Sequence, residues 1–551
     1  MTAGERRHAA LARLASRRFD LLIVGGGATG AATARDAALR GLDVALVDAG
    51  DFAGETSSQS SKLIHGGLRY LQYGDLHLVF EGLSERRNLM RTAPHLCRPV
   101  EFLFPAYSGE RPTLTTLGIG IRLYNALALW RPPARGRSLR TEQLTKLAPQ
   151  LRSVGLDGAQ AYVDCQTDDA RLVLEHVLDA EASGATIVNH VRATALRRDA
   201  HGRVRGVALV DCGTGAAMEA RATVVISATG PFTDSFVAGG GAPRLRPTLG
   251  VHLVFDAARL PHNGRVLVLR SPRDNRLFFV LPAGLRTHVG TTDTDWPSPE
   301  PPRLGSDIRA RGADVAYLLE ALNHCMPSLR LAADDVLSTY AGLRPLLATG
   351  ANTPSQTSRE HDIALQPDGM IIVAGGKLTT MRRMGEQVVD RALDVLRATG
   401  LERPIDSCVT AHRRLPGGGP PPAALAASPL AEDVRAHLAA AYGARAADLL
   451  AMMAPFDHLA ARIDPELPYV WGEVAFAARH EHARSVVDAL VRRVPLFRDA
   501  RDQGLAAAGD AATLLADELG WTPTERARAV DDYRATVDRS RLWRGELRAV
   551  T

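Results

Sequence analysis

The chain of 551 residues has few cysteines and little net charge, and each shortage excludes a class of protein. Its five cysteines stand far apart without a Cys-x-x-Cys pair, which argues against a disulfide framework or a zinc site and predicts reduced thiols. Lysine and arginine number 66 against 61 aspartate and glutamate residues. A net charge of only +5 is weak evidence for a nucleic-acid partner, and none is expected.

Long apolar runs and an apolar N-terminal core are also missing. No run of about 18 apolar residues occurs, so no membrane-spanning helix is predicted. The N-terminus lacks a signal-peptide core, so a cytoplasmic location is expected. Residues 5–18 are predicted to form a short basic amphipathic helix. We interpret it as a solvated lead-in helix, with a membrane-surface contact as the alternative.

Residues Phe19–Asp51 show the order strand, glycine turn, helix and strand. The apolar run Leu21–Val24 predicts a buried strand. The pattern G-x-G-x-x-G follows at Gly25, Gly27 and Gly30. The first glycine permits a tight turn, the second lets the backbone approach a pyrophosphate, and the third lets helix and strand pack closely. The pyrophosphate binds at the helix N-terminus, so the segment predicts a dinucleotide site.

The acid after the second strand indicates which dinucleotide binds. Residues 31–40 are expected to be helical and residues 44–47 to form a strand that ends at Asp48. An acid near this position holds the ribose hydroxyls, which favours FAD or NAD over NADP without choosing between them. Two later segments favour flavin. Residues 222–230 resemble the strand beneath the adenosine half of FAD in flavoproteins, and residues 369–393 form another strand–glycine–helix unit.

Further motifs carry a family resemblance over residues 18–545. They are SSKLIHGGLRY at 60–70, YAGLRPL at 340–346, TSREHDI at 357–363 and GGKLTTMRRM at 375–384. The chain resembles the FAD-dependent glycerol-3-phosphate dehydrogenases, respiratory enzymes of the D-amino-acid-oxidase-like flavoprotein superfamily. It departs from the family pattern by having Phe232 for Trp, Met381 for Tyr and Asp48 for Glu. These departures affect fine positioning and not the reaction class.

The resemblance implies an α/β fold whose first domain is interrupted by insertions. A discontinuous two-dinucleotide-fold FAD-binding domain is expected from residues 18–95, 160–245 and 340–400. Residues 96–159 and 246–339 are expected to form a substrate-binding cap domain. Strand-like stretches separated by turn residues predict an antiparallel β-sheet there.

The remaining chain is predicted to be a helical domain behind a linker. Residues 415–429, rich in proline and glycine, are the predicted linker, and residues 430–551 resemble the family's C-terminal α-helical domain. Four of its polar residues are interpreted as buried caps and helix–helix ion pairs and not as a metal site: Glu473, His480, Glu481 and Arg492. The apolar stretch Thr116–Trp130 is interpreted as core packing, with a membrane contact as the alternative.

The resemblance also implies FAD as a noncovalent cofactor. Two glycines, Gly66 and Gly67, are expected to let the backbone approach the flavin ring. The residues expected to bind the cofactor are Gly25, Gly27, Gly30, Asp48, Thr56, Ser57, Ser58, Ser61, Lys62, His65, Gly66, Gly230, Gly375, Gly376, Leu378 and Thr379.

The implied substrate, sn-glycerol 3-phosphate, is a small dianion that needs fixed cations. Arginine suits phosphate because its planar fork donates two parallel hydrogen bonds. The residues expected to bind substrate are Arg69, Tyr70, Thr292, Asp293, Arg344, Arg359 and Lys377. Lys377, next to a helix N-terminus, is also expected to stabilise negative charge on reduced flavin.

The implied reaction moves a hydride from carbon 2 of the substrate to flavin N5 and gives dihydroxyacetone phosphate. A base must take the hydroxyl proton, and His65 and His252 are equal candidates. Arg344 and Lys377 complete the expected catalytic set. Electrons are expected to pass to a membrane quinone through a peripheral contact with the inner face of the cytoplasmic membrane. A homodimer is left open.

Three other functions remain as alternatives. An oxidase would pass electrons to oxygen and release hydrogen peroxide. An amine or amino-acid oxidase would need a carboxylate pocket without a phosphate site, which the extra Arg and Lys residues argue against. A flavin-bound structural protein without turnover is disfavoured by the intact motifs.

Overall fold

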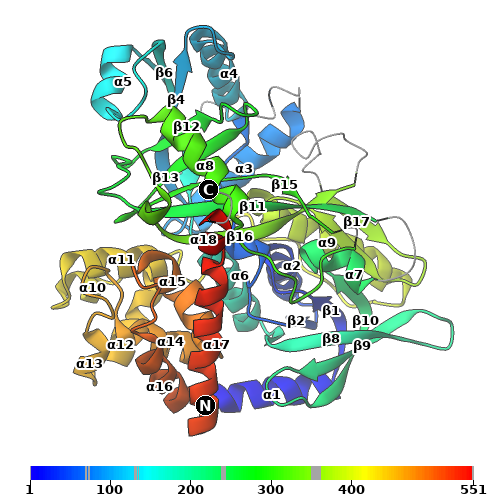
Figure 1. Ribbon diagram of the computed structural model, residues 1–551. Helices are drawn as coiled ribbons and strands as arrows, with labels where there is room; N and C mark the ends of the chain where they lie inside the picture. Colours follow the sequence, from blue (N-terminus) through cyan, green and yellow to red (C-terminus); the bar gives the residue numbers. More distant parts are fainter. Residues whose placement is uncertain are drawn as a thin grey trace.

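The computed structural model describes residues 2–68, 71, 75–129, 133, 136–237, 243–298, 300–348 and 361–548. Two β-sheets and a group of C-terminal helices make up the molecule (Figure 1). In that view one sheet lies low on the right, the other lies above it, and the C-terminal helices stand low on the left. The functional site lies between the two sheets.

The first sheet, with eight strands in the described residues, is the dinucleotide-binding sheet. Its centre is β1 (Arg18–Val24), which pairs in parallel with β2 (Val44–Val47) and β10 (Ala217–Ser227). β18 (Ile371–Gly375) pairs in parallel with β10. The sheet also contains β7 (Thr186–Val188), β8 (Val191–Arg198), β9 (Val204–Asp211) and β17 (His361–Leu365). Three segments distant in sequence therefore build one sheet, as expected.

The alternation of β1 side chains explains how this sheet is covered. Leu21 and Ile23 face a helical layer, which consists of α2 (Ala28–Leu39), α6 (Asp169–Ala182) and α9 (Met381–Ala398). Leu22 and Val24 face the opposite side, where strands β8 and β9 fold over. Both faces are therefore apolar, as a parallel strand buried on two sides requires.

The second sheet, with ten strands in the described residues, forms the roof of the site. β11 (Leu245–Asp256) pairs antiparallel with β14 (Arg286–Gly290) and β16 (Val336–Leu347). Most pairs are antiparallel, as expected, but β12 runs parallel to β4. Its other strands are β3 (Leu63–Ile64), β4 (Arg98–Tyr107), β5 (Arg137–Leu139), β6 (Leu156–Gln166), β12 (Val266–Arg270), β13 (Leu277–Ala283) and β15 (Thr294–Asp295).

Helices cover both faces of the second sheet. α8 (Gly312–Cys325) and Trp543 of α18 (Trp543–Arg548) pack on one face. α3 (Leu76–Thr92) and α4 (Leu114–Leu127) pack on the other. A short helix, α5 (Thr141–Leu147), follows β5. The stretch at 116–130 thus packs partly into a core, as interpreted from the sequence.

Strand membership differs from the predicted division in three places. β6, most of which falls in the predicted nucleotide-binding segment 160–245, pairs with β4 and β5 in the second sheet. β3 pairs with β6, and β16 pairs with β11, so both belong to the second sheet. The predicted nucleotide-binding segments contained all of β3 and most of β16. Both strands are continuous in sequence with site loops that face the first sheet, and only pairing partners far away in the chain reveal their membership.

The C-terminal domain is helical. It contains α10 (Ala423–Ala427), α11 (Glu432–Tyr442), α12 (Ala446–Met453), α13 (Asp457–Ala460), α14 (Trp471–His480), a π-helix (Asp488–Arg493), α15 (Leu496–Asp499), α16 (Ala508–Leu519) and α17 (Pro523–Arg541).

The predicted linker is packed against the body of the protein. Gly417 donates its N–H to Glu175 of α6 at 2.6 Å, and a Cβ at Gly417 would lie 2.5 Å from His95 Nε2. Glycine in this stretch therefore serves close packing as well as chain reversal.

The predicted N-terminal helix is α1 (Ala3–Ser16), and it is docked on the protein. Leu14 is fully buried, and Arg7 donates to the Asn189 carbonyl at 2.7 Å and to Asp211 at 3.0 Å. The solvated lead-in expected from the sequence is corrected here, because its apolar side meets β7 and β10. No helix in the described part of the chain combines the length and apolar character needed to span a bilayer.

Candidate active site

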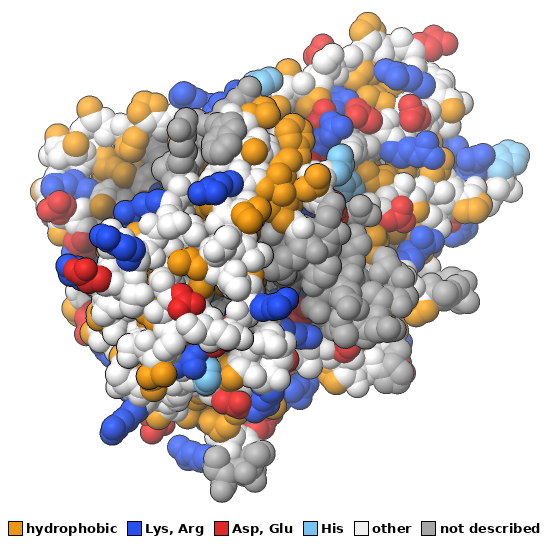
Figure 2. All heavy atoms as spheres, turned by 90° about the horizontal axis from the view of Figure 1, so that it is seen from above, with side chains coloured by type: hydrophobic (Ala, Val, Ile, Leu, Met, Phe, Trp, Pro, Cys, Tyr) orange, Lys and Arg blue, Asp and Glu red, His pale blue; other side chains and the backbone are white. Residues whose placement is uncertain are grey.

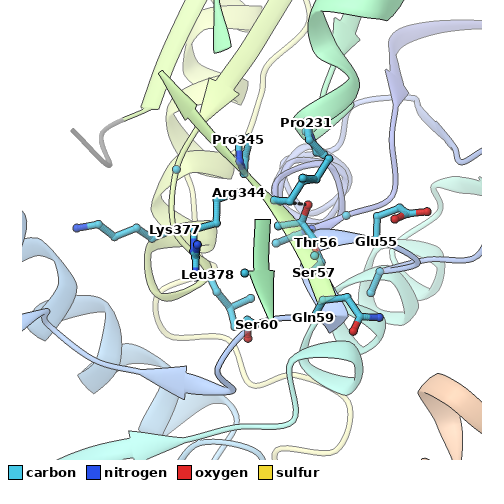
Figure 3. A pocket seen from close by; sticks show the side chains of 18 of the residues that line it. Glu55, Thr56, Ser57, Gln59, Ser60, Pro231, Arg344, Pro345, Lys377 and Leu378 are labelled. Atoms are coloured by element: carbon cyan, nitrogen blue, oxygen red, sulfur yellow. Dashed lines mark hydrogen bonds between the residues drawn. The ribbon is translucent and has the colours of Figure 1, made fainter. Parts of the chain in front are cut away.

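A cavity of about 1550 Å³ lies between the two sheets. Its wall combines the turn after β1, the loop at 55–61, strands β11 and β16, and the turn between β18 and α9. In Figure 3, Lys377 and Leu378 lie on one side of the cavity, and Glu55, Thr56 and Ser57 lie on the other. These elements meet only because the three nucleotide-binding segments share one sheet.

The glycine turn after β1 forms a close-packed cradle at the start of α2. A Cβ at Gly25 would overlap the carbonyl of Ala228, and one at Gly30 would overlap the carbonyl of Gly25. Gly25 and Gly27 line the cavity, whereas Gly30 lies beneath it and allows helix and strand to touch. The N-terminus of α2 faces the cavity and favours an anion there.

Asp48 lies at the end of β2, on the cavity wall, and shapes the glycine turn. Its carboxylate accepts the N–H groups of Gly26 at 2.6 Å and Gly50 at 2.8 Å. Burial raises the pKa of Asp48, while these two backbone hydrogen bonds lower it. A carboxylate has about four acceptor sites, so Asp48 retains capacity for a ribose hydroxyl.

The loop at 55–61 is held against β16. The Thr56 hydroxyl donates to the Leu343 carbonyl at 2.7 Å, and a Cβ at Gly342 would lie 2.6 Å from Gln59 Cβ. The Ser57 hydroxyl accepts the Ala28 N–H at 2.9 Å. Thr56, Ser57 and Ser61 all line the cavity. The loop thus joins the first turn of α2 to the roof of the site.

The turn between β18 and α9 closes the opposite side. Gly375 and Gly376 have φ values of 77° and 102°, a conformation that favours glycine. Lys377, Leu378 and Thr379 follow directly, and all of these residues line the cavity. The Thr379 hydroxyl accepts the backbone N–H of His65 at 3.2 Å, which places His65 on the same wall. Gly230, on the turn after β10, also lines it.

Arg344 projects from β16 into the site and is fixed by neighbouring groups. Its guanidinium donates to Asp293 at 2.9 Å, to the Thr291 hydroxyl at 2.9 Å and to the Thr292 carbonyl at 2.9 Å. Arg344 lines the cavity, whereas Thr292 and Asp293 lie behind it. Thr292 is buried and accepts the Val251 N–H at 3.0 Å, so both residues position Arg344.

His252 lies on β11 with its ring held on several sides. It stacks on Tyr340 with centroids 4.5 Å apart and planes 7° apart, and its Nε2 meets Ser61 Oγ at 2.9 Å. Its Nδ1 has no hydrogen-bond partner among the described residues. Burial, then the charges of Arg344 and Lys62, lower the pKa of His252 well below its usual value. The imidazole is therefore neutral at ordinary pH.

Besides Gly30, which lies beneath the cavity, three more residues predicted to bind the cofactor do not line it. Lys62 is buried in an ion pair with Asp169, and Ser58 is buried behind the loop; neither lines the cavity. Gly66 faces α3, because a Cβ there would lie 2.7 Å from Leu83 Cγ and 2.8 Å from the Tyr124 hydroxyl. Only Gly67 of that glycine pair lines the cavity. Arg69, Tyr70 and Arg359 lie outside the described residues.

The polar cluster of the C-terminal domain forms ion pairs, as interpreted from the sequence. Glu473 accepts from His437 at 2.7 Å, and Glu481 pairs with Arg445 at 2.8 Å and with Arg171 at 3.2 Å. No group of side chains in the described residues has the composition of a metal site.

The same domain also contributes to the cavity wall, which the sequence did not indicate. Five of its residues line the cavity together with His190: Ser485, Val487, Asp488, Arg492 and Asp532. The sequence signal for this contribution was the pattern of Asp488, Arg492 and Arg493 on one helix. Ion pairs within the domain explain that pattern equally well, so it did not predict a place on the cavity wall.

Comparisons with known proteins match nearly the whole length of the chain. Residues 20–391 match the family described as FAD dependent oxidoreductase, and residues 408–526 match the C-terminal domain of alpha-glycerophosphate oxidase. The glycerol-3-phosphate dehydrogenase of Synechocystis sp. is 33% identical over 95% of this chain and 97% of its own. Glycerol-3-phosphate dehydrogenase 2 of Mycobacterium bovis is 35% identical over 97% of this chain and 90% of its own.

The chain belongs to the FAD-dependent glycerol-3-phosphate dehydrogenase family. The crystal structure of the Bacillus halodurans glycerol-3-phosphate dehydrogenase complexed with FAD covers 98% of each chain with a TM-score of 0.78 and 28% identity. The expected fold, enzyme class and cofactor are confirmed, and the protein is an FAD-dependent oxidoreductase. The close glycine cradle, the helix N-terminus and the long cavity fit this cofactor.

Proposed function

We propose that this enzyme oxidises sn-glycerol 3-phosphate to dihydroxyacetone phosphate and passes the electrons to a membrane quinone. FAD, when bound, supplies the acceptor for the hydride that leaves carbon 2 of the substrate. The observation that carries the proposal is the pair of cations, Arg344 and Lys377, that face one cavity beside the cofactor cradle. Relatives matching nearly the entire chain are glycerol-3-phosphate dehydrogenases, which supports the same substrate.

Arg344 and Lys377 bind the phosphate of the substrate in this proposal. Arg344 is held rigidly by Asp293 and Thr291, so little conformational freedom is lost when a dianion binds. Lys377 lies at the turn before α9, where the helix N-terminus adds positive potential. Arg69, Tyr70 and Arg359 remain predicted substrate ligands. An amino-acid substrate would not need this concentration of cations.

His252 takes the proton of the substrate hydroxyl in this proposal. His252 Nδ1 is enclosed and cannot reach a substrate, so the proton is taken at Nε2, which meets Ser61 Oγ at 2.9 Å on the cavity wall. A phosphate dianion beside Arg344 offsets one cause of the low pKa of His252, so substrate binding itself makes the imidazole a stronger base. His65, on the facing wall, is the alternative base.

The quinone approaches through the apolar end of the cavity. Residues of the second sheet, of α4 and of the connection after β3 line this end: Leu68, Phe104, Leu117, Ile119, Leu123 and Phe279. Ile119 is 60% exposed and Leu123 is 42% exposed on α4, while Leu76 and Phe80 are exposed on the neighbouring α3. Figure 2 views the molecule from the end that carries α4 and shows hydrophobic side chains gathered there. We assign the peripheral membrane contact to this surface.

Anaerobic mixing of the FAD-loaded enzyme with sn-glycerol 3-phosphate tests the substrate. We expect rapid loss of the oxidised flavin absorbance, slowed by Arg344→Ala. Arg259→Ala is the matched control, because Arg259 pairs with Asp335 away from the cavity and should leave the rate unchanged. An unchanged spectrum in a fully loaded enzyme would refute the proposal.

Re-oxidation of the reduced enzyme then identifies the electron acceptor. We expect fast re-oxidation by a soluble quinone analogue and slow re-oxidation by oxygen. Rapid oxygen consumption with stoichiometric hydrogen peroxide would instead identify an oxidase. Flotation with anionic vesicles, compared between the wild type and Ile119→Ser/Leu123→Ser, tests the membrane surface.

A further inference from the structure

We propose that Arg492, supplied by the C-terminal domain, binds the ADP portion of FAD directly. This domain follows the nucleotide-binding segments in the chain and packs against them through buried ion pairs. Arg492 forms one of these buried ion pairs, with Asp51. Among the described residues, it is the arginine of this domain that also lines the cofactor cavity. The inference rests on the cofactor and is independent of the substrate and the electron acceptor.

The position of Arg492 is fixed by two carboxylates. Its Nε donates to Asp51 at 2.5 Å, and its Nη2 donates to Asp488 at 2.8 Å. Asp51 follows the ribose acid Asp48 by three positions, at the same end of the cavity. Asp488 is held in turn by His190, whose Nε2 lies 2.8 Å from its carboxylate. The guanidinium therefore cannot swing away from this end of the cavity.

Arg492 has donors left for a ligand. A guanidinium has five N–H groups, and the two bonds described use two of them. Its Nη1 makes no hydrogen bond to any described residue, yet it is not among the fully enclosed unpartnered nitrogens. Arg492 lines the cavity whose wall also includes Asp48, as well as a small second cavity beside Lys62, and we assign these donors to the larger space. Diphosphate oxygens and ribose hydroxyls are suitable acceptors for such a group.

The local charge gives a reason for an arginine at this place. Asp48, Asp51 and Glu55 all line the same end of the cavity. Burial raises the pKa of Glu55, and the charge of Arg492 opposes that rise. Without Arg492, these acids would face a cofactor that itself carries a negatively charged diphosphate. Arg492 thus offsets a repulsion that the glycine turn alone leaves in place.

Arg493 provides a control within the same cluster. It donates to both oxygens of Asp51, at 2.6 Å and 2.9 Å, so it shares the ion pair with Arg492. Arg493 does not line the cavity. A residue that only holds the two domains together should behave like Arg493, whereas a cofactor ligand should not.

The test measures the affinity of the full-length FAD-free protein for FAD, ADP and FMN by titration. For Arg492→Gln we expect FAD and ADP to bind about 10- to 100-fold more weakly, because a charge-assisted hydrogen bond is lost. FMN, which lacks the adenosine phosphate, should bind with less change. Arg493→Gln should lose stability to heat but keep most of its affinity for ADP. Equal losses of ADP affinity in the two variants would overturn the proposal.

A second variant keeps the proposal open to refutation if Arg492→Gln does not fold. Arg492→Lys retains the charge next to Asp51 but cannot reach Asp51, Asp488 and the cofactor together. We expect a folded protein with a smaller loss of FAD and ADP affinity. A folded Arg492→Lys protein with wild-type affinity for both would show that Arg492 does not touch the cofactor. Wild-type ADP affinity in folded Arg492→Gln would show the same.

Discussion

At the scale of single residues, the placement of His252 depends on a neighbour that has no side chain. Gly290 lies opposite His252 in the β11–β14 pair, and a Cβ there would overlap the imidazole ring. Tyr340, from the strand on the other side, stacks on the same ring. Histidine, glycine and tyrosine from three strands therefore fix one imidazole, and a change at any of them reorients it.

His252→Gln should lower kcat by about 10²- to 10⁴-fold, the usual contribution of a positioned base. FAD content should remain normal, measured by absorbance, because the glycine cradle is untouched. His262→Gln, on the connection between β11 and β12, is the control and should retain activity. Because the pKa of His252 is held well below 6.5, it should cause no acid limb in kcat/KM near that pH. An acid limb near 6.5 that vanishes in His65→Gln would assign the base to His65.

Sequence reasoning at this scale is most direct where spacing alone determines the local backbone geometry. Gly25 and Gly27 line the cavity because the turn after a buried strand admits few conformations. It failed for Lys62, whose partner Asp169 is 107 residues away and invisible in the local motif. Arg492 was missed for the same reason, because Asp51 lies 441 residues before it.

At the scale of elements, the segment beside the cavity is pressed against α3. A Cβ at Gly66 would meet Leu83 of α3 and the Tyr124 hydroxyl of α4. A Cβ at Gly82 of α3 would lie 3.0 Å from Gly66 Cα. The two glycines allow a helix to contact an extended segment backbone to backbone. Gly66 therefore serves the packing of α3, and of the two glycines in this motif only Gly67 lines the cavity.

Gly66→Ala should destabilise the protein by about 1–3 kcal/mol, as expected for overpacking a filled core. The displaced α3 should also shift His65, so kcat should fall together with the temperature of unfolding. Gly509→Ala is the control, because its Cβ would meet nothing within 4 Å on α16. A Gly66→Ala protein with wild-type unfolding temperature and activity would contradict the packing described here.

The sequence predicted the order of elements in the nucleotide-binding unit well. It did not predict how α1 and the stretch around Gly417 pack against the rest of the protein. The strand–turn–helix order at the N-terminal glycine motif is observed, with α2 beginning at Ala28 rather than near residue 31. The docking of α1 was not foreseen, since a basic amphipathic pattern is the same on water, lipid or protein. The packing of Gly417 against His95 likewise could not be predicted, because the local composition is that of an ordinary linker.

At the scale of the whole molecule, several histidines are buried without charge. Burial, then the charge of Arg35, lowers the pKa of His176 to about 3, and burial, then Arg171, lowers that of His95 to about 4. In the unfolded chain both have a pKa near about 6.5. The unfolded state therefore gains protons below that pH while the folded state does not, so stability is complete above about pH 6.5 and declines as the pH falls.

Unfolding by urea between pH 8 and pH 4.5 should show this decline. Each buried histidine contributes up to about 1.4 kcal/mol per pH unit once the pH is below its unfolded pKa. His176→Leu should make the slope shallower, since one titrating group is removed. His201→Gln, on an exposed turn, should leave the slope unchanged. Equal slopes for wild type and His176→Leu would contradict the assignment.

The division of the sheet among three segments has a consequence for synthesis on the ribosome. β1 emerges early, but its partner β10 follows far later in the chain, and β18, which pairs with β10, and Arg492 follow later still. At about 5–20 residues per second, the interval between β1 and β10 lasts roughly 10–40 seconds. During that time the apolar strand β1 lacks β10, one of the two strands with which it pairs. A messenger cut short after β18 would therefore yield a chain that holds every strand of the first sheet but lacks Arg492, and we expect it to bind FAD more weakly.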